Sequence, residues 1–136
     1  MSSPITCHVL NTLNGTPAAG ISATLTLISP LPSQEASAPS TASPLLAFTS
    51  TTNEDGRVKE WTPSTSRTLQ DVISLYKDGE KTAWSIKFNV GEWYEKQGVE
   101  AFWPEVEVKF YVKKGERHYH VPVLVGPWTY TTYRGS

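Results

Sequence analysis

Two histidines lie two residues apart near the end of the chain, in the run His118-Tyr119-His120. Successive side chains of a β-strand point to opposite faces, so an extended chain would place His118 and His120 on one face. Imidazole changes its charge near neutral pH, and two such rings together could transfer protons or bind a metal ion. They could equally be solvated side chains of a surface strand, and this segment alone leaves both interpretations open.

The third histidine, His8, directly follows the single cysteine of the chain. The pattern of residues 5–10 predicts a strand in which Cys7 and His8 face opposite ways. A nucleophile–base pair between them is therefore not expected, and Cys7 is predicted to lie in the core. His8 shares its face with Thr6, which favours a polar surface or a cleft. A lone cysteine also excludes an internal disulfide.

Two chemistries are compatible with these histidines. His8, His118 and His120 could hold a zinc ion, although no carboxylate is evidently placed to orient their ring nitrogens. Alternatively, a neutral histidine could take a proton from water while an arginine binds an anionic substrate and its developing oxyanion. Arg57 directly follows a predicted turn over residues 53–56, and this position alone favours a solvated turn charge. We favour the metal-free chemistry and predict no bound metal.

The elements that would position these side chains are mostly short strands. Alternating apolar and polar residues, with turn residues between them, predict about eight strands and a short helix over residues 92–97 that ends at Gly98. Gly126-Pro127 predicts a turn between the last two strands, and Pro122 a bulge or an edge position. Residues 62–81 cannot be assigned well. This pattern is typical of an all-β antiparallel sandwich in a single domain over residues 1–136.

The whole-chain composition excludes several classes of protein. The 136 residues carry a formal net charge of −1, so nothing suggests a nucleic-acid or anionic-membrane partner. No apolar run approaches the ~20 residues of a membrane span. The first residues lack a basic patch followed by an apolar stretch, so we expect a cytoplasmic or peroxisomal rather than a secreted protein. Residues 30–43 are rich in proline and serine and predict a flexible loop.

Several segments together resemble 5-hydroxyisourate hydrolases, the transthyretin-like enzymes of urate breakdown. The resemblance rests on Thr6-Cys7-His8-Val9-Leu10-Asn11-Thr12, Asn53-Glu54-Asp55-Gly56-Arg57, the segment from Gly98 to Val106, His118-Tyr119-His120-Val121-Pro122 and the terminal Tyr133-Arg134-Gly135-Ser136. It covers nearly the whole chain except the loop over residues 30–43. It implies a transthyretin-like sandwich of two four-stranded sheets with one short helix, assembled as a homotetramer with active sites in a channel between dimers.

The same resemblance implies a reaction and a set of residues. The reaction is cofactor-free hydrolysis of 5-hydroxyisourate to 2-oxo-4-hydroxy-4-carboxy-5-ureidoimidazoline. The implied catalytic residues are His8, Arg57 and His120, and the implied substrate-binding residues are Tyr133, Arg134, Ser136 and His118. Asn11 departs from the family, which commonly has an aspartate there. The alternative function is a transthyretin-like carrier of a small hydrophobic ligand, which would need an apolar channel rather than these polar side chains.

Overall fold

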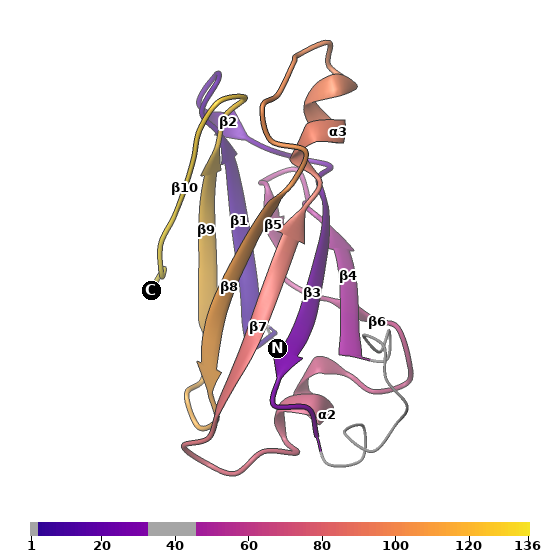
Figure 1. Ribbon diagram of the computed structural model, residues 1–136, viewed down its shortest axis with the longest axis vertical. Coiled ribbons are helices and arrows are strands. Elements are labelled where there is room, and N and C mark those ends of the chain that lie inside the picture. Colours follow the sequence, from indigo (N-terminus) through magenta and orange to yellow (C-terminus); the bar gives the residue numbers. More distant parts are fainter. Residues whose placement is uncertain (1–2, 33–45) are drawn as a thin grey trace.

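Two β-sheets pack face to face in the computed structural model, which describes residues 3–32 and 46–136 (Figure 1). One sheet has the order β10-β9-β1-β2, with β5 also paired to β1, and the other the order β6-β4-β3-β7-β8. The predicted all-β sandwich is confirmed. The strands are β1 (Ile5–Asn11), β2 (Thr16–Pro17), β3 (Ser22–Ser29), β4 (Ala47–Thr51), β5 (Arg57–Val58), β6 (Thr62–Pro63), β7 (Lys81–Phe88), β8 (Val106–Lys113), β9 (Tyr119–Val125) and β10 (Tyr130–Thr132).

The number of strands and helices differs from the prediction. Each sheet has five strands rather than four, because the two-residue strands β2, β5 and β6 extend the pairing at the edges. Within the described residues there are two short helices rather than one. Helix α2 (Leu69–Ile73) begins at a capping box between Thr68 and Asp71, and helix α3 (Val90–Glu95) begins two residues before the predicted position.

One strand pair departs from the predicted antiparallel arrangement. Strands β1 and β9 run parallel, in register from Ile5 opposite Tyr119 to Asn11 opposite Val125. The pairing contains no register shift at Pro122, so the predicted bulge is absent. Pro122 instead lies one residue beyond the segment of β9 that pairs with β10, where no partner strand requires its missing N–H. The predicted turn at Gly126-Pro127 does connect β9 to β10.

The core lies between the sheets and contains the apolar face of β1. Ile5, Cys7 and Val9 have no exposed surface and pack in one cluster with buried side chains of the other sheet, among them Trp84 and Ile86. Burial raises the pKa of the Cys7 thiol to about 12, which keeps it protonated. The prediction that Cys7 belongs to the core is confirmed, and its strand turns His8 to the opposite face.

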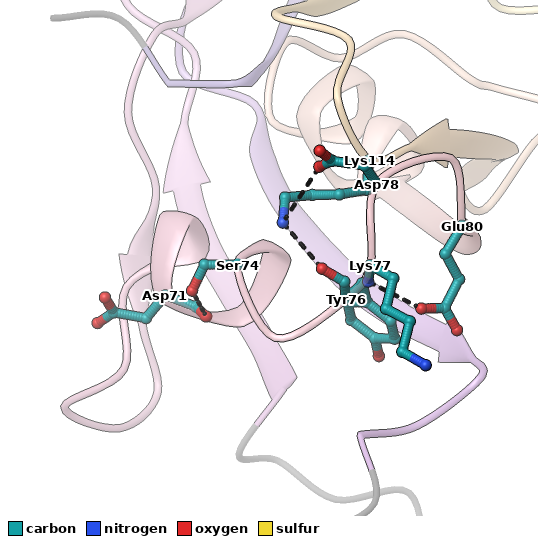
Figure 2. A network of polar contacts seen from close by, with 7 residues as sticks. All are labelled: Asp71, Ser74, Tyr76, Lys77, Asp78, Glu80 and Lys114. Carbon is teal, nitrogen blue, oxygen red and sulfur yellow. Dashed lines mark hydrogen bonds and ion pairs between the residues drawn. The ribbon is translucent and has the colours of Figure 1, made fainter.

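The loop after α2 is joined to the turn that leads into β9 (Figure 2). Lys114 donates a hydrogen bond from Nζ to the Tyr76 carbonyl (2.8 Å), and its Nζ lies 3.9 Å from Asp78 Oδ1. Backbone bonds reinforce this contact: the Gly79 N–H donates to the Lys114 carbonyl, and the Lys114 N–H donates to the Glu80 carbonyl. The connection between β8 and β9, which precedes His118, is thereby joined to the segment that leads from α2 into the start of β7.

The structure bears on two further expectations, the loop over residues 30–43 and the absence of a membrane span, only for the residues that it describes. Most of the predicted loop over residues 30–43 lies outside them. Within residues 3–32 and 46–136, no helix is long and apolar enough to cross a membrane.

Candidate active site

The turn before β5 places Arg57 and a backbone carbonyl next to β1. Asn53 accepts hydrogen bonds at Oδ1 from the N–H groups of Asp55 (2.9 Å) and Arg57 (3.0 Å), which closes the turn. Gly56 has a φ of +75°, and a Cβ there would lie 2.4 Å from the Val9 carbonyl oxygen. Only glycine combines this backbone conformation with so close an approach to β1.

His8 is held by this turn. It pairs with Arg57 across the β1–β5 register, and its Nε2 lies 3.0 Å from the Asp55 carbonyl oxygen. A carbonyl only accepts hydrogen bonds, so Nε2 of His8 carries a proton and donates it. In the neutral ring, Nδ1 is therefore the nitrogen with a free lone pair.

His118 and His120 share one hydrogen-bonding partner on β1. Thr6 lies opposite His120 in the parallel register, and its Oγ1 is 2.8 Å from His120 Nδ1 and 3.0 Å from His118 Nε2. The His120 ring centroid lies 6.2 Å from that of His118 and 6.5 Å from that of His8. The structure therefore brings together three histidines that come from opposite ends of the sequence.

The C-terminal tail closes over the same region. The Gly135 N–H donates to the His120 carbonyl (2.9 Å). A Cβ at Gly135 would lie 2.7 Å from His120 Cδ2 and 3.0 Å from Pro122 Cγ, closer than real Cβ contacts. The absence of a side chain at Gly135 thus lets the tail lie against the His120 ring and brings Ser136 to the site.

An open cleft of about 460 Å³ lies beside these groups, and His8 is not among the residues that line it. Its lining includes Thr6, Arg57, Lys59, His118, His120 and Ser136. The guanidinium of Arg57 and the ammonium group of Lys59 on its wall suit the cleft to an anionic ligand.

The surroundings of His8 and His120 favour the neutral form of both rings. The pKa of His120 is lowered from the ordinary 6.5, first by burial and then by the charge of Arg57 and the neighbouring histidines. The pKa of His8 is also lowered by burial and by Arg57, and its hydrogen bond to Asp55 only partly offsets this. Both rings are therefore largely neutral at pH 7, and each has a nitrogen able to accept a proton.

Tyr133 and Arg134 lie in a neighbouring pocket of about 280 Å³ that shares His120 with the cleft. The Arg134 guanidinium is 3.5 Å from Glu116 Oε2 and 4.7 Å from the centroid of the Tyr119 ring. The Tyr119 hydroxyl donates to Glu116 Oε1, and this bond holds the pKa of the Glu116 carboxyl below its usual range. The structure thus places Arg134 on a protein carboxylate, beside the cleft rather than within it.

Comparison with known proteins assigns this arrangement to a family. A family model described as HIUase/Transthyretin family matches residues 5–135. The chain belongs to that family. It is 37% identical over 134 residues to a probable 5-hydroxyisourate hydrolase of Schizosaccharomyces pombe, covering 97% of this chain and 90% of the relative. It is 36% identical over 135 residues to the 5-hydroxyisourate hydrolase of Mus musculus, covering 99% and 97%.

A solved structure of the HIUase/Transthyretin family has the same fold. The 5-hydroxyisourate hydrolase of Klebsiella pneumoniae superposes with a TM-score of 0.65 at 24% identity, covering 100% of both chains. The family predicted from the sequence motifs is therefore confirmed, and so is the transthyretin-like sandwich.

Asn11, the departure from the family pattern, lies outside the cleft. It is 2% exposed at the end of β1, and its Oδ1 accepts hydrogen bonds from the Tyr94 hydroxyl (2.7 Å) and the Leu13 N–H (3.1 Å). An aspartate oxygen could accept the same two bonds. The amide therefore has a structural role that connects β1 to α3, and it is not among the residues that line the cleft.

The zinc alternative requires several ligands around one point. Among the residues that the structure describes, no group of three or more histidine, cysteine, aspartate or glutamate side chains is arranged to hold a metal ion. Thr6 already contacts one nitrogen of each of the rings of His118 and His120.

Sequence reasoning missed three residues of this site, Thr6, Lys59 and Gly135. Thr6 was recognised only as sharing a face with His8. Its role depends on the parallel register of β1 and β9, which local alternation does not reveal. Gly135 stands in the C-terminal motif, but its contact with the His120 ring depends on the path of the tail.

Proposed function

We propose that the cleft hydrolyses 5-hydroxyisourate, a reaction of purine catabolism. Two observations support the reaction class: the chain belongs to the family, and it aligns over nearly its full length, at 37% and 36% identity, with two hydrolases named for this substrate. The observation that carries the proposal is the placement of His120, whose pKa is lowered, in one cleft with Arg57. His8 lies opposite Arg57 in the β1–β5 register, with its ring 6.5 Å from that of His120. An apolar carrier channel would not require these groups.

In this proposal His120 is the general base. Its Nε2 takes a proton from water, and the water oxygen bonds to a ring carbonyl carbon of the substrate. Arg57 stabilises the negative charge that develops on the carbonyl oxygen. The carbon–nitrogen bond then breaks, the leaving nitrogen recovers the proton from His120, and the new carboxyl group loses its own proton to solvent. His8 is fixed by the Asp55 carbonyl, and its ring lies 6.5 Å from that of His120.

The other predicted residues are assigned to substrate binding. His118 and Ser136 line the cleft itself. Tyr133 and Arg134 line the pocket on the far side of His120, where they would contact the part of the substrate that extends past this ring. No cofactor enters the scheme, because the base, the anion-binding group and the nucleophilic water suffice for hydrolysis.

Stopped-flow ultraviolet absorbance tests the proposal. The substrate is made fresh from urate with urate oxidase, and its decay is followed with and without the protein. The wild-type protein should accelerate decay, and Arg57→Ala should lower kcat/KM by roughly 10²–10³-fold, the effect typical of losing one oxyanion-stabilising group.

Lys96→Ala is the matched control. It also removes one positive charge, but from an exposed side chain after α3 that pairs with Glu92. It should retain the wild-type rate. Decay at the spontaneous rate in the presence of the folded wild-type protein would contradict the proposal and favour the carrier function, which a screen for hydrophobic ligands would then test.

A further inference from the structure

The Thr6 hydroxyl contacts two imidazole rings at once. Thr6 is only 7% exposed, and its Oγ1 lies 2.8 Å from His120 Nδ1 and 3.0 Å from His118 Nε2. Both distances are within the range of ordinary hydrogen bonds. A β-branched side chain has few χ1 rotamers, so β1 holds this hydroxyl in place between the two rings.

A hydroxyl has one proton to donate, which couples the two histidines. If Thr6 donates to His120 Nδ1, the neutral His120 ring carries its proton on Nε2 and cannot act there as a base. If Thr6 instead accepts from His120 Nδ1–H, its own proton is available for His118 Nε2. Only the second arrangement leaves the lone pair on His120 Nε2 that the proposed function needs.

We infer that Thr6 is a positioning residue that fixes His120 as a base and connects it to His118 as a proton relay. This inference rests on the proposed function of the cleft. In the resting state the chain of donors runs from His120 Nδ1–H to Thr6 Oγ, and from Thr6 Oγ–H to His118 Nε2.

The relay step is balanced in protons and needs no further reactant. When His120 Nε2 takes a proton from water, the ring becomes an imidazolium. Its Nδ1 proton then passes to Thr6 Oγ, while the Thr6 hydroxyl proton passes to His118 Nε2. The positive charge moves from His120 to the exposed His118 ring, and the reverse transfers restore the His120 imidazolium before its Nε2 proton passes to the leaving nitrogen.

The groups around His120 favour transfer of its positive charge to His118. The groups facing His120 from the neighbouring elements are His8 on β1, Arg57 on β5 and His118 before β9, with Lys59 and Ser136 also lining the cleft. None of these is a carboxylate side chain that would hold a proton on His120. Transfer through Thr6 carries the positive charge away from the half-buried ring to an exposed one.

Nitrogen-15 NMR of the histidine rings tests the arrangement without any substrate. At a pH where the rings are neutral, His118 and His120 should both carry the proton on Nδ1, whereas His8 should carry it on Nε2. Thr6→Val has the shape of threonine without the hydroxyl, and it should shift His118 and His120 toward Nε2–H. Thr6→Ser should keep the wild-type pattern. A wild-type His120 with its proton on Nε2 would overturn the inference.

Turnover with 5-hydroxyisourate tests the relay itself. Thr6→Val should lower kcat by roughly tenfold, less than the full contribution of a general base, with little change in KM. Thr6→Ser should restore most of the rate. His118→Phe should lower kcat to a similar extent, and the double variant should be no slower than either single variant, because both interrupt one path.

The possible outcomes separate the two proposals. Equal kcat values for Thr6→Val and the wild type, in proteins with matching melting temperatures, would overturn the relay and leave the hydrolase function intact. Additive losses in the double variant would likewise overturn a shared path. Failure of the wild-type protein to accelerate decay would overturn the proposed function and the relay with it, while the ring NMR would still report whether Thr6 couples the two histidines.

Discussion

At the scale of single residues, the protonation of His8 and His120 decides whether either ring can accept a proton from water. Both pKa values are lowered, chiefly by burial and next by Arg57, so both rings lose their proton at a lower pH than an ordinary histidine. The neutral, proton-accepting form is therefore retained at pH 7 and lost as the pH falls through the lowered pKa values. Activity that depends on these rings should decline on the acidic side of 6.5.

This electrostatic effect can be measured directly. In a proton NMR titration of the histidine rings, His8 and His120 should titrate below 6.5 in the wild-type protein. Arg57→Gln removes the nearby positive charge, so both pKa values should rise toward 6.5. Lys96→Gln, which removes a distant charge, should leave them unchanged. Unaltered pKa values in Arg57→Gln would show that Arg57 does not act on these rings.

The contact between Gly135 and His120 makes a second prediction at this scale. Alanine at position 135 would bring a methyl group within 2.7 Å of His120 Cδ2, so either the tail or the ring must move. Catalysis is sensitive to such shifts, and we expect Gly135→Ala to lower kcat/KM by roughly tenfold or more. Thr131→Ala changes an exposed position in β10 and should leave kcat/KM at the wild-type value. A fully active Gly135→Ala enzyme would show that the placement of the tail against His120 is unimportant.

At the scale of elements, Asn11 connects β1 to α3 through the buried Tyr94 hydroxyl. Asn11→Leu would remove the acceptor for both the Tyr94 hydroxyl and the Leu13 N–H. It should therefore lower the free energy of unfolding by about 1–3 kcal/mol. Asn11→Asp keeps both acceptor bonds and should be close to wild type. Chemical denaturation measures both variants. Equal losses for the two would contradict the assignment of Asn11 as an acceptor in the fold.

The strands were predictable where alternation is strong, and β1 is the clearest example. Its pattern correctly placed Cys7 in the core and His8 on the other face. Strand β5 shows the opposite case, because its two residues, Arg57 and Val58, are too few for alternation to appear. Helix α2 was not assigned, since its five residues are too few for a 3.6-residue period to appear and its capping box carries most of the local signal.

The sequence predicted which residues form the candidate site better than it predicted how they lie relative to one another. Alternation indicated that His118 and His120 share a face, and the motifs pointed to Arg57. The distance between His8 and His120 depends on the parallel pairing of β1 with β9, which joins residues more than one hundred positions apart. The partner of Arg134 was equally hidden, because Glu116 lies in a turn whose side chains have no periodic pattern.

At the scale of the whole molecule, several large apolar side chains remain exposed on this chain. Phe102 is 62% exposed, Tyr111 64%, Trp128 64% and Tyr133 58%. The rings of Phe102 and Trp128 lie 6.2 Å apart and form part of one aromatic surface with Trp103 and Tyr130. Exposed apolar surface of this kind typically marks contacts between proteins.

We therefore propose that the chain assembles as a homotetramer, as the family resemblance implies. Size-exclusion chromatography with light scattering should give the mass of four chains. Trp128→Glu should shift the population toward smaller species, because it places a charge within the aromatic surface. Glu107→Gln, an exposed change on β8, should remain tetrameric. A wild-type protein that is monomeric at micromolar concentration would contradict this assembly.

One kinetic comparison measures whether His120 is the general base for hydrolysis of 5-hydroxyisourate. Stopped-flow absorbance would follow 5-hydroxyisourate decay with the wild-type protein and with His120→Ala, after circular dichroism has established that both are folded. We predict that the wild type accelerates decay and that His120→Ala lowers kcat by roughly 10²–10⁴-fold. An unchanged kcat in folded His120→Ala would remove His120 from the mechanism and contradict the account.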